Sequence, residues 1–387
     1  GVSANWATRE QENNRDHWSL SHQGRWGWAT SDMALFQETS SREGKATPAQ
    51  TDIYGRKPEI KSTVFDAKLV VPTAHNVSTV GVQWNESQLT DWNQGLGDRV
   101  DYEFSVVQKA VFAENEWAMT DTFALTTGLR LDHHEQYGTH ANPRIYGVWR
   151  ATDNWTLKGG IARGFKAPEL RAVVKDYAYL RRNRFVMFGN PDLKPESSTN
   201  YEMSALWSNR DNLSACATVF YNDFKDKLST VTTDERWNGY IVMDRVNVDK
   251  AVIQGVELTG QWDVSDSVLL KANYTYTDSE QKSGANAGAP LALTPKQKAN
   301  VRGEWVVTDR AQAWASVSYY GEETGNTLAD VPAPGYTTAD IGGSYELTDS
   351  ITLNSSLNNL TDKRLDDETY GTVNYGRTLW MGATLNF

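Results

Sequence analysis

Residues 268–277 read VLLKANYTYT, and this short run decides the fold class. One alternating set is apolar or aromatic, and the set between it is largely polar: Val268, Leu270, Ala272, Tyr274 and Tyr276 against Lys271, Asn273, Thr275 and Thr277. Because successive side chains of a β-strand point to opposite faces, a period of two predicts an amphipathic strand. The same alternation recurs at 123–132, 311–319 and 339–346. Helical periodicity is nearly absent, so the sequence predicts an all-β protein.

The connections between the expected strands alternate in length. Short polar turns occur at 151–154, 264–267, 307–310 and 347–350, whereas long polar segments occur at 41–58, 164–197, 224–248, 277–291 and 321–334. A soluble sandwich or propeller has no reason to separate its loops by length, but a membrane barrel has short turns on one side and long loops on the other. Closure is expected because an open edge would leave backbone groups unpaired in hydrocarbon. We therefore predict a transmembrane antiparallel β-barrel of roughly 18 strands.

Composition narrows the class further. The 387 residues include 15 Trp, 17 Tyr and 11 Phe, an abundance typical of aromatic belts at membrane interfaces. No apolar run approaches the roughly 18 residues that a membrane helix needs, which excludes a helical membrane protein. The formal net charge is −11, which argues against nucleic acid as a partner. A single cysteine, Cys216, excludes an internal disulfide and a cysteine-rich metal site.

Two motifs resemble the barrel signature of TonB-dependent outer-membrane receptors. The first is ARGFKAPELR at 162–171, which contains Phe165, Lys166, Ala167 and Pro168. The second is GNPDLKPE at 189–196, which contains Asn190, Pro191, Asp192, Leu193, Lys194, Pro195 and Glu196. QGVE at 254–257 and LNNLTDK at 357–363 are similar to further segments of that family. The resemblance covers almost the whole chain and is strongest after about residue 80.

Three segments refine the resemblance. LRLDHHEQYG at 129–138, WTLKGG at 155–160 and GAPL at 288–291 resemble the catecholate siderophore receptors that double as colicin I receptors. The resemblance implies an outer-membrane receptor that imports ferric siderophores of the catecholate type. It further implies coupling to TonB through a plug domain, and contacts with outer-membrane lipid and lipopolysaccharide; it leaves open whether a colicin also binds.

The family barrel has about 22 strands around its plug, and this sequence departs from that pattern. The plug and the energy-coupling box are missing, so we expect residues 1–387 to be the C-terminal part of the barrel, without the plug and the first strands. A natural plug-free channel is the alternative. The last expected strand carries Leu379, Met381, Ala383, Leu385 and Phe387 on one face. The pair Leu385 and Phe387 resembles the signal read by the barrel-assembly machinery, although an amphipathic edge strand would look the same.

One long loop is the best candidate for ligand binding. Its cationic and aromatic residues are Arg171, Lys175, Tyr177, Tyr179, Arg181, Arg182, Arg184, Phe185 and Phe188. Ferric catecholates are anionic and aromatic, so guanidinium groups and aromatic rings suit them. A second candidate lies on the next long loop, with Arg236, Trp237, Tyr240 and Arg245. A lipopolysaccharide-facing loop and a docking surface for a bacteriocin are the alternative roles.

No enzyme motif is found, and neither a cofactor nor a metal site is predicted. GxSxG, HExxH, a phosphate loop and GxGxxG after a strand are all lacking. The neighbours His133 and His134 would point to opposite faces of a strand, so they cannot share an ion. The rival functions are a passive porin-like channel and a receptor for haem, vitamin B12 or a copper complex. A soluble lectin or adhesin is the remaining rival.

Overall fold

The structure is a computed structural model that describes residues 11–44, 57–93, 100–175, 177–181, 184–284, 287–324, 332–370, 374 and 376–386. Its strands are β1 (Gln11–Arg25), β2 (Thr30–Gly44), β3 (Glu59–Pro72), β4 (Asn76–Trp92), β5 (Asp101–Ala118), β6 (Phe123–His134), β7 (Gly138–Arg150), β8 (Trp155–Lys166), β9 (Ala178–Arg181), β10 (Phe185–Phe188), β11 (Glu196–Ser208), β12 (Leu213–Trp237), β13 (Tyr240–Ser265), β14 (Val268–Gln281), β15 (Gln297–Thr308), β16 (Ala311–Tyr320), β17 (Tyr336–Thr348), β18 (Ile351–Asn358) and β19 (Thr378–Leu385). Two four-residue helices, α1 (Leu170–Val173) and α2 (Asp367–Tyr370), interrupt the connections. Among these residues no helix is long and apolar enough to cross a membrane.

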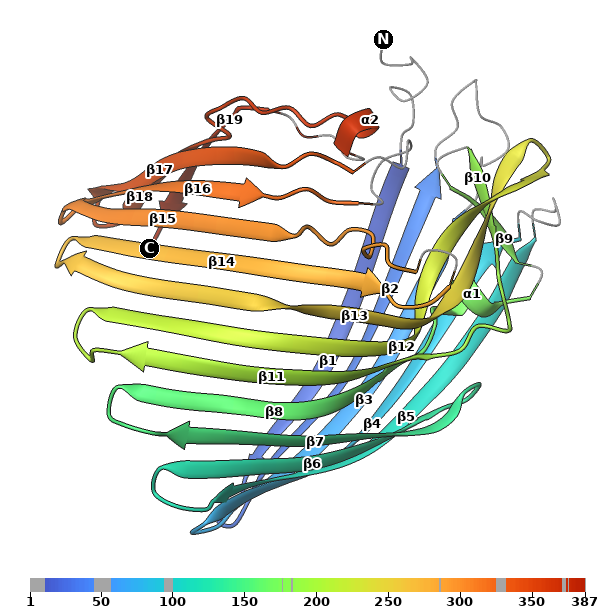
Figure 1. The fold of residues 1–387 in the computed structure, drawn as a ribbon, viewed down its shortest axis with the longest axis horizontal. Helices are drawn as coiled ribbons and strands as arrows, with labels where there is room; N and C mark the ends of the chain where they lie inside the picture. The colour runs from blue at the N-terminus through green and yellow to red at the C-terminus, as the bar shows by residue number, and fades with distance from the viewer. Residues whose placement is uncertain are drawn as a thin grey trace.

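The strands form one curved antiparallel wall, as Figure 1 shows. Strands β1 to β8 and β11 to β19 form a continuous meander, in which each strand pairs with the next. The two short strands β9 and β10 lie outside the meander, and β10 pairs in parallel with β13. Among the described residues the meander has 17 strands, which agrees with the predicted number of roughly 18. No ladder joins β1 to β19 in the part of the chain that the structure describes, so these two strands are the edges of the wall.

The connections separate by length as predicted. Short turns join neighbouring strands at one end of the wall, which we call the turn end: 26–29, 73–75, 119–122, 151–154, 209–212, 266–267, 309–310 and 349–350. Figure 1 shows this end at the left and lower left, and the longer connections at the opposite end, which we call the loop end. Two loop-end connections between described strands are short, 135–137 between β6 and β7 and 238–239 between β12 and β13.

The prediction of a long loop at 224–248 is wrong. Strand β12 continues to Trp237 and β13 begins at Tyr240, so the two strands form one long hairpin. Its tip, Asn238 and Gly239, has positive φ angles of 47° and 87°, which suits a tight hairpin turn. The hairpin contains many β-branched residues, which favour strands. The predicted loop 164–197 likewise contains α1, β9 and β10.

The two faces of the wall differ in chemistry. On the outer face, Val317 is 50% exposed, and Leu258 is 44% exposed beside its cross-strand neighbour Tyr274. On the other, luminal face, the buried carboxylate of Asp132 accepts hydrogen bonds from Arg130 at 3.0 Å and from Asn142 at 2.8 Å. An apolar outer face and a polar inner face are the arrangement that a membrane barrel requires.

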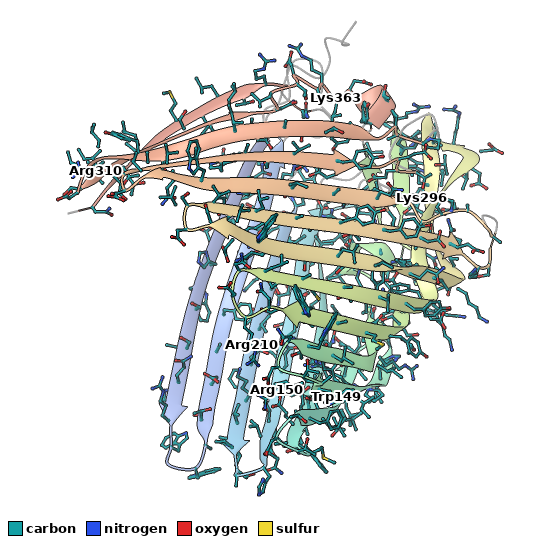
Figure 2. All side chains as sticks on the ribbon, turned by 60° about the vertical axis from the view of Figure 1, so that its left-hand side comes forward. Trp149, Arg150, Arg210, Lys296, Arg310 and Lys363 are labelled. Carbon is teal, nitrogen blue, oxygen red and sulfur yellow. The ribbon has the colours of Figure 1, made fainter. Side chains whose placement is uncertain are left out.

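A belt of aromatic side chains lies on the outer face at the turn end. Its members are Trp117, Trp149, Trp155, Trp262, Trp305 and Tyr345, all of them exposed. Figure 2 shows Trp149 next to Arg150, at the end of β7. Amphipathic rings at this level are typical of a membrane–water interface. The belt holds five of the 15 tryptophans of this polar chain.

We predict that a charge on the outer face destabilises the barrel more than the same charge on the luminal face. Val317→Arg places a guanidinium toward lipid and should lower the free energy of unfolding by about 2–4 kcal/mol. Ser318→Arg, one residue along the same strand, faces the lumen and should cost about 1 kcal/mol or less. Urea unfolding of the complete protein in phospholipid vesicles, followed by tryptophan fluorescence, measures both. Equal losses would contradict the assignment of the two faces.

Candidate ligand-binding site

The connection between β8 and β11, residues 167–195, crosses the loop end of the wall; we call it the crossing segment. The Tyr177 hydroxyl donates to Asp91, and the Ala178 N–H donates to Asn93 Oδ1 at 3.0 Å. Asp91 lies on the same face of β4 as Gln83, a residue of the luminal polar network. The Tyr177 ring meets Phe104 of β5 edge-on, with centroids 5.9 Å apart. The crossing segment therefore folds against the luminal side of β4 and β5.

A small sheet joins the crossing segment to the long hairpin. Strand β9 pairs with β10, and β10 pairs with β13 at Ile241, Val242 and Met243. Ala178, Val186 and Val242 are buried between these strands. Phe188 meets Trp237 edge-on at 5.9 Å. The structure thus brings together the two loops that the sequence suggested as separate ligand candidates.

Arg171, Tyr179 and Arg245 meet at this junction, and we call them the arginine–tyrosine cluster. The guanidinium carbon of Arg171 lies 5.3 Å from the centroid of the Tyr179 ring, and that of Arg245 lies 6.0 Å from it. Arg245 also donates to the Tyr179 hydroxyl at 2.8 Å, and that hydroxyl donates to Met187 Sδ at 3.2 Å. Two guanidinium groups around one aromatic ring form a surface of cationic and aromatic groups, and the exposed Glu169 carboxylate lies 3.9 Å from Arg245 Nη2.

The other predicted ligand residues differ in accessibility. Arg184 is exposed and stacks over Phe185 at 5.5 Å, and Arg236 is exposed near the hairpin tip. Trp237 and Tyr240 are half-buried and pack against the small sheet. Tyr177 is completely buried, so this prediction needs correction: its ring and hydroxyl hold the crossing segment to the wall.

Two members of the predicted set cannot be placed in the site. The backbone of Arg181 ends β9, but its side chain lies outside the described part. Arg182 lies outside the described residues, as does Phe387 of the predicted assembly signal. Leu385, the other residue of that signal, is 62% exposed on the outer face of β19.

The GNPDLKPE motif attaches the crossing segment to β13 and to α1. Asn190 Nδ2 donates to the Arg245 carbonyl at 3.1 Å, and the Asn190 side chain accepts from the Asp192 N–H at 3.0 Å. Leu193 is buried against Ala172 and Val173 of α1. The backbone of Lys194 exchanges two hydrogen bonds with the Asn247 side chain, each 2.9 Å long.

Glu196 ends this motif as a buried carboxylate. It accepts from Lys227 Nζ at 2.8 Å and from the Leu228 N–H at 2.7 Å, and Lys166 Nζ lies 3.8 Å away.

In the first motif, Phe165 stacks on His140 with centroids 4.0 Å apart, and Pro168 is buried next to Ala167. The first motif thus contributes Arg171 to the cluster, while the buried residues of both motifs hold the crossing segment in place.

The histidines lie as predicted on opposite faces of β6. His133 is exposed and hydrogen-bonded to Thr139 at 2.9 Å, whereas His134 is buried beside Tyr137. Burial raises the pKa of Tyr137, which lies in the turn after β6 and packs against the α1 cluster. Within the described ranges, no group of three or more His, Cys, Asp and Glu residues could hold a metal ion.

The sequence did not indicate a second aromatic cluster at the loop end. Tyr320 and Tyr336 stack with centroids 5.0 Å apart, and Tyr370 meets Tyr336 edge-on at 5.7 Å. Lys363, labelled in Figure 2, donates to the Tyr370 hydroxyl at 2.7 Å. These residues come from three separate segments, so no local pattern could have revealed their contact.

Known proteins are similar to this chain over nearly all its length. It is 37% identical over 401 residues to an iron-regulated outer membrane virulence protein of Vibrio cholerae, and 29% identical over 405 residues to a ferric enterobactin receptor of Pseudomonas aeruginosa. These alignments cover 100% and 91% of this chain but only 59% and 54% of the relatives. The chain thus spans little more than half of their length.

A solved structure is also similar. The crystal structure of a variant of a Pseudomonas aeruginosa ferric enterobactin receptor matches with a TM-score of 0.83 and 26% identity, covering 97% of this chain and 62% of that one. Residues 2–360 match the family described as TonB dependent receptor-like, beta-barrel. The chain therefore belongs to the β-barrel family of TonB-dependent receptors.

Proposed function

We propose that this chain forms the wall and the loop-end binding site of an outer-membrane receptor for ferric siderophores of the catecholate type. The family consists of transport receptors rather than enzymes. Relatives named for ferric enterobactin favour this substrate class over haem or vitamin B12. A passive channel would not need a folded cationic site at its mouth.

The arginine–tyrosine cluster is the observation that supports the substrate class. A ferric tris-catecholate carries negative charge on a complex with aromatic outer surfaces, and a guanidinium attracts the charge while a ring stacks on the surface. Arg171 and Arg245 flank Tyr179, and Arg184 and Arg236 add exposed positive charge nearby. Arg181 and Arg182 belong to the same proposal from their sequence positions.

Transport is proposed to be energised by TonB through a plug domain, with this wall enclosing the plug. Outer-membrane lipid would contact the aromatic belt and the apolar outer face, and lipopolysaccharide would contact the loop end. Whether a colicin uses the same loops is a further part of the proposal, supported only by the sequence resemblance.

Removing the two arginines of the cluster should weaken siderophore binding. In the complete receptor, Arg171→Gln combined with Arg245→Gln should raise the Kd for ferric enterobactin roughly 10- to 100-fold, because we expect the two arginines together to contribute about as much as one hydrogen bond to a charged group, roughly 1.5–3 kcal/mol. Quenching of intrinsic fluorescence by the ferric complex measures the Kd. Arg310→Gln at the turn end, whose side chain pairs only with the exposed Asp349 among described residues, is the matched control. Unchanged affinity in the double variant would refute the proposed site.

A further inference from the structure

Asp91 is a completely buried carboxylate at the loop end of β4. A buried charge is costly unless it is paired and hydrogen-bonded. Its partners in the crossing segment are the Tyr177 hydroxyl, which donates to it, and the Arg171 guanidinium, whose Nη2 lies 4.0 Å from Asp91 Oδ2. Asp91 therefore joins the wall to the residue that we place in the ligand site.

Arg171 lies between this carboxylate and the Tyr179 ring. One side of its guanidinium faces Asp91, and its central carbon lies 5.3 Å from the ring centroid. Its Nε atom is buried and has no hydrogen-bond partner in the part of the chain that the structure describes. The cation–π contact with the ring alone is a weak restraint. The charge of Asp91 is the stronger force that fixes this long side chain.

We propose that Asp91 is a positioning residue for Arg171, which it holds beside Tyr179 in the orientation that receives an anionic ligand. This inference rests on the proposed function. A long arginine side chain loses considerable rotamer freedom when a ligand immobilises it. A guanidinium fixed before binding loses less, so Asp91 increases affinity without contacting the ligand.

The first test needs no ligand. In the complete receptor, phenylglyoxal modifies accessible arginines, and mass spectrometry measures the rate at each position. Asp91→Asn keeps the shape and the acceptor for Tyr177 but removes the charge, so Arg171 should react about tenfold faster while Arg245 reacts at its original rate. Asp91→Glu restores the charge and should return Arg171 to within about twofold of the original rate, which a purely packing role would not do.

Asn93→Ala is the matched control for this test. It removes a second side-chain contact to the crossing segment, in which Asn93, the residue after β4, accepts from the Ala178 N–H. Arg171 should then react at nearly its original rate. An unchanged rate in Asp91→Asn, or an equal rise in Asn93→Ala, would overturn the positioning role.

The second test uses ferric enterobactin and a double-mutant cycle. Asp91→Asn should weaken binding about tenfold when Arg171 is present and less than twofold in the Arg171→Gln background, because the effect passes through Arg171. An equal loss in both backgrounds would show a merely structural role and would overturn the inference. If Asp91→Asn raises the rate at which phenylglyoxal modifies Arg171 but no variant changes the Kd, the positioning role stands and the proposed ligand role of Arg171 fails.

Discussion

Replacing Gly189 by alanine is expected to detach the crossing segment from the barrel while the wall stays folded. A Cβ atom at this position would lie 1.9 Å from the carbonyl oxygen of Val174 and 2.8 Å from its carbonyl carbon. These are backbone atoms, so the chain itself must move. The Gly189 N–H donates to Tyr177 O and the Asn190 N–H donates to Ala172 O, both at 2.7 Å, and a shift would break both bonds. Together the overlap and the lost bonds should cost about 3 kcal/mol or more.

Limited proteolysis separates a detached segment from an unfolded barrel. The segment carries exposed trypsin sites at Lys175 and Arg184. A local cost of about 3 kcal/mol raises the open population roughly 100-fold, so cleavage there should accelerate by a similar factor. Heat-modifiable migration in gels should remain, because the wall does not depend on Gly189. Gly260→Ala is the control, since the nearest atom to its Cβ would be 3.8 Å away. Cleavage at the original rate would contradict the steric argument.

The wall could be predicted because its residues face two different solvents. Val268 to Tyr276 alternate in polarity because one side meets lipid and the other side meets water. Beyond the membrane both faces of a strand are wet, and the alternation disappears. The sequence pattern therefore predicts a polar loop at 224–248, although these residues belong to β12, its hairpin tip and β13. Their β-branched residues carried the only local signal for strands.

The residue types of the candidate site could be predicted from the sequence, but the contacts between them could not. The density of arginine and tyrosine in 171–188 indicated a cationic aromatic surface. It did not show that Tyr177 is buried while Tyr179 meets two guanidinium groups. Those roles depend on Asp91, 86 residues from Tyr177, and on Arg245, 66 residues from Tyr179. Such partners lie on other strands, and their pairing follows from the tertiary fold alone.

Glu196→Ala is expected to loosen the outer half of the long hairpin. The mutation removes the acceptor of Lys227 and of the Leu228 N–H, next to the point where Asp226 takes a positive φ of 54°. Removing one partner of a buried ion pair typically costs about 3–5 kcal/mol. The Lys227 side chain is 27% exposed, so water recovers part of the loss and we expect about 3 kcal/mol. Hydrogen exchange of the backbone amides in 227–248 should accelerate roughly 100-fold, while the wall strands exchange as before.

A second substitution separates the cost of leaving the Lys227 ammonium unpaired from the cost of lost packing. Lys227→Met in the Glu196→Ala background removes the unpaired ammonium, and replacing both partners of a buried pair by apolar groups is often nearly neutral. The double variant should therefore exchange more slowly than Glu196→Ala alone, although the Leu228 N–H still lacks its acceptor. Glu196→Gln keeps that acceptor and should cost only about 1–2 kcal/mol. If the double variant exchanges as fast as the single one, the unpaired Lys227 ammonium contributes little to the loss, which then comes from the Leu228 N–H and from packing.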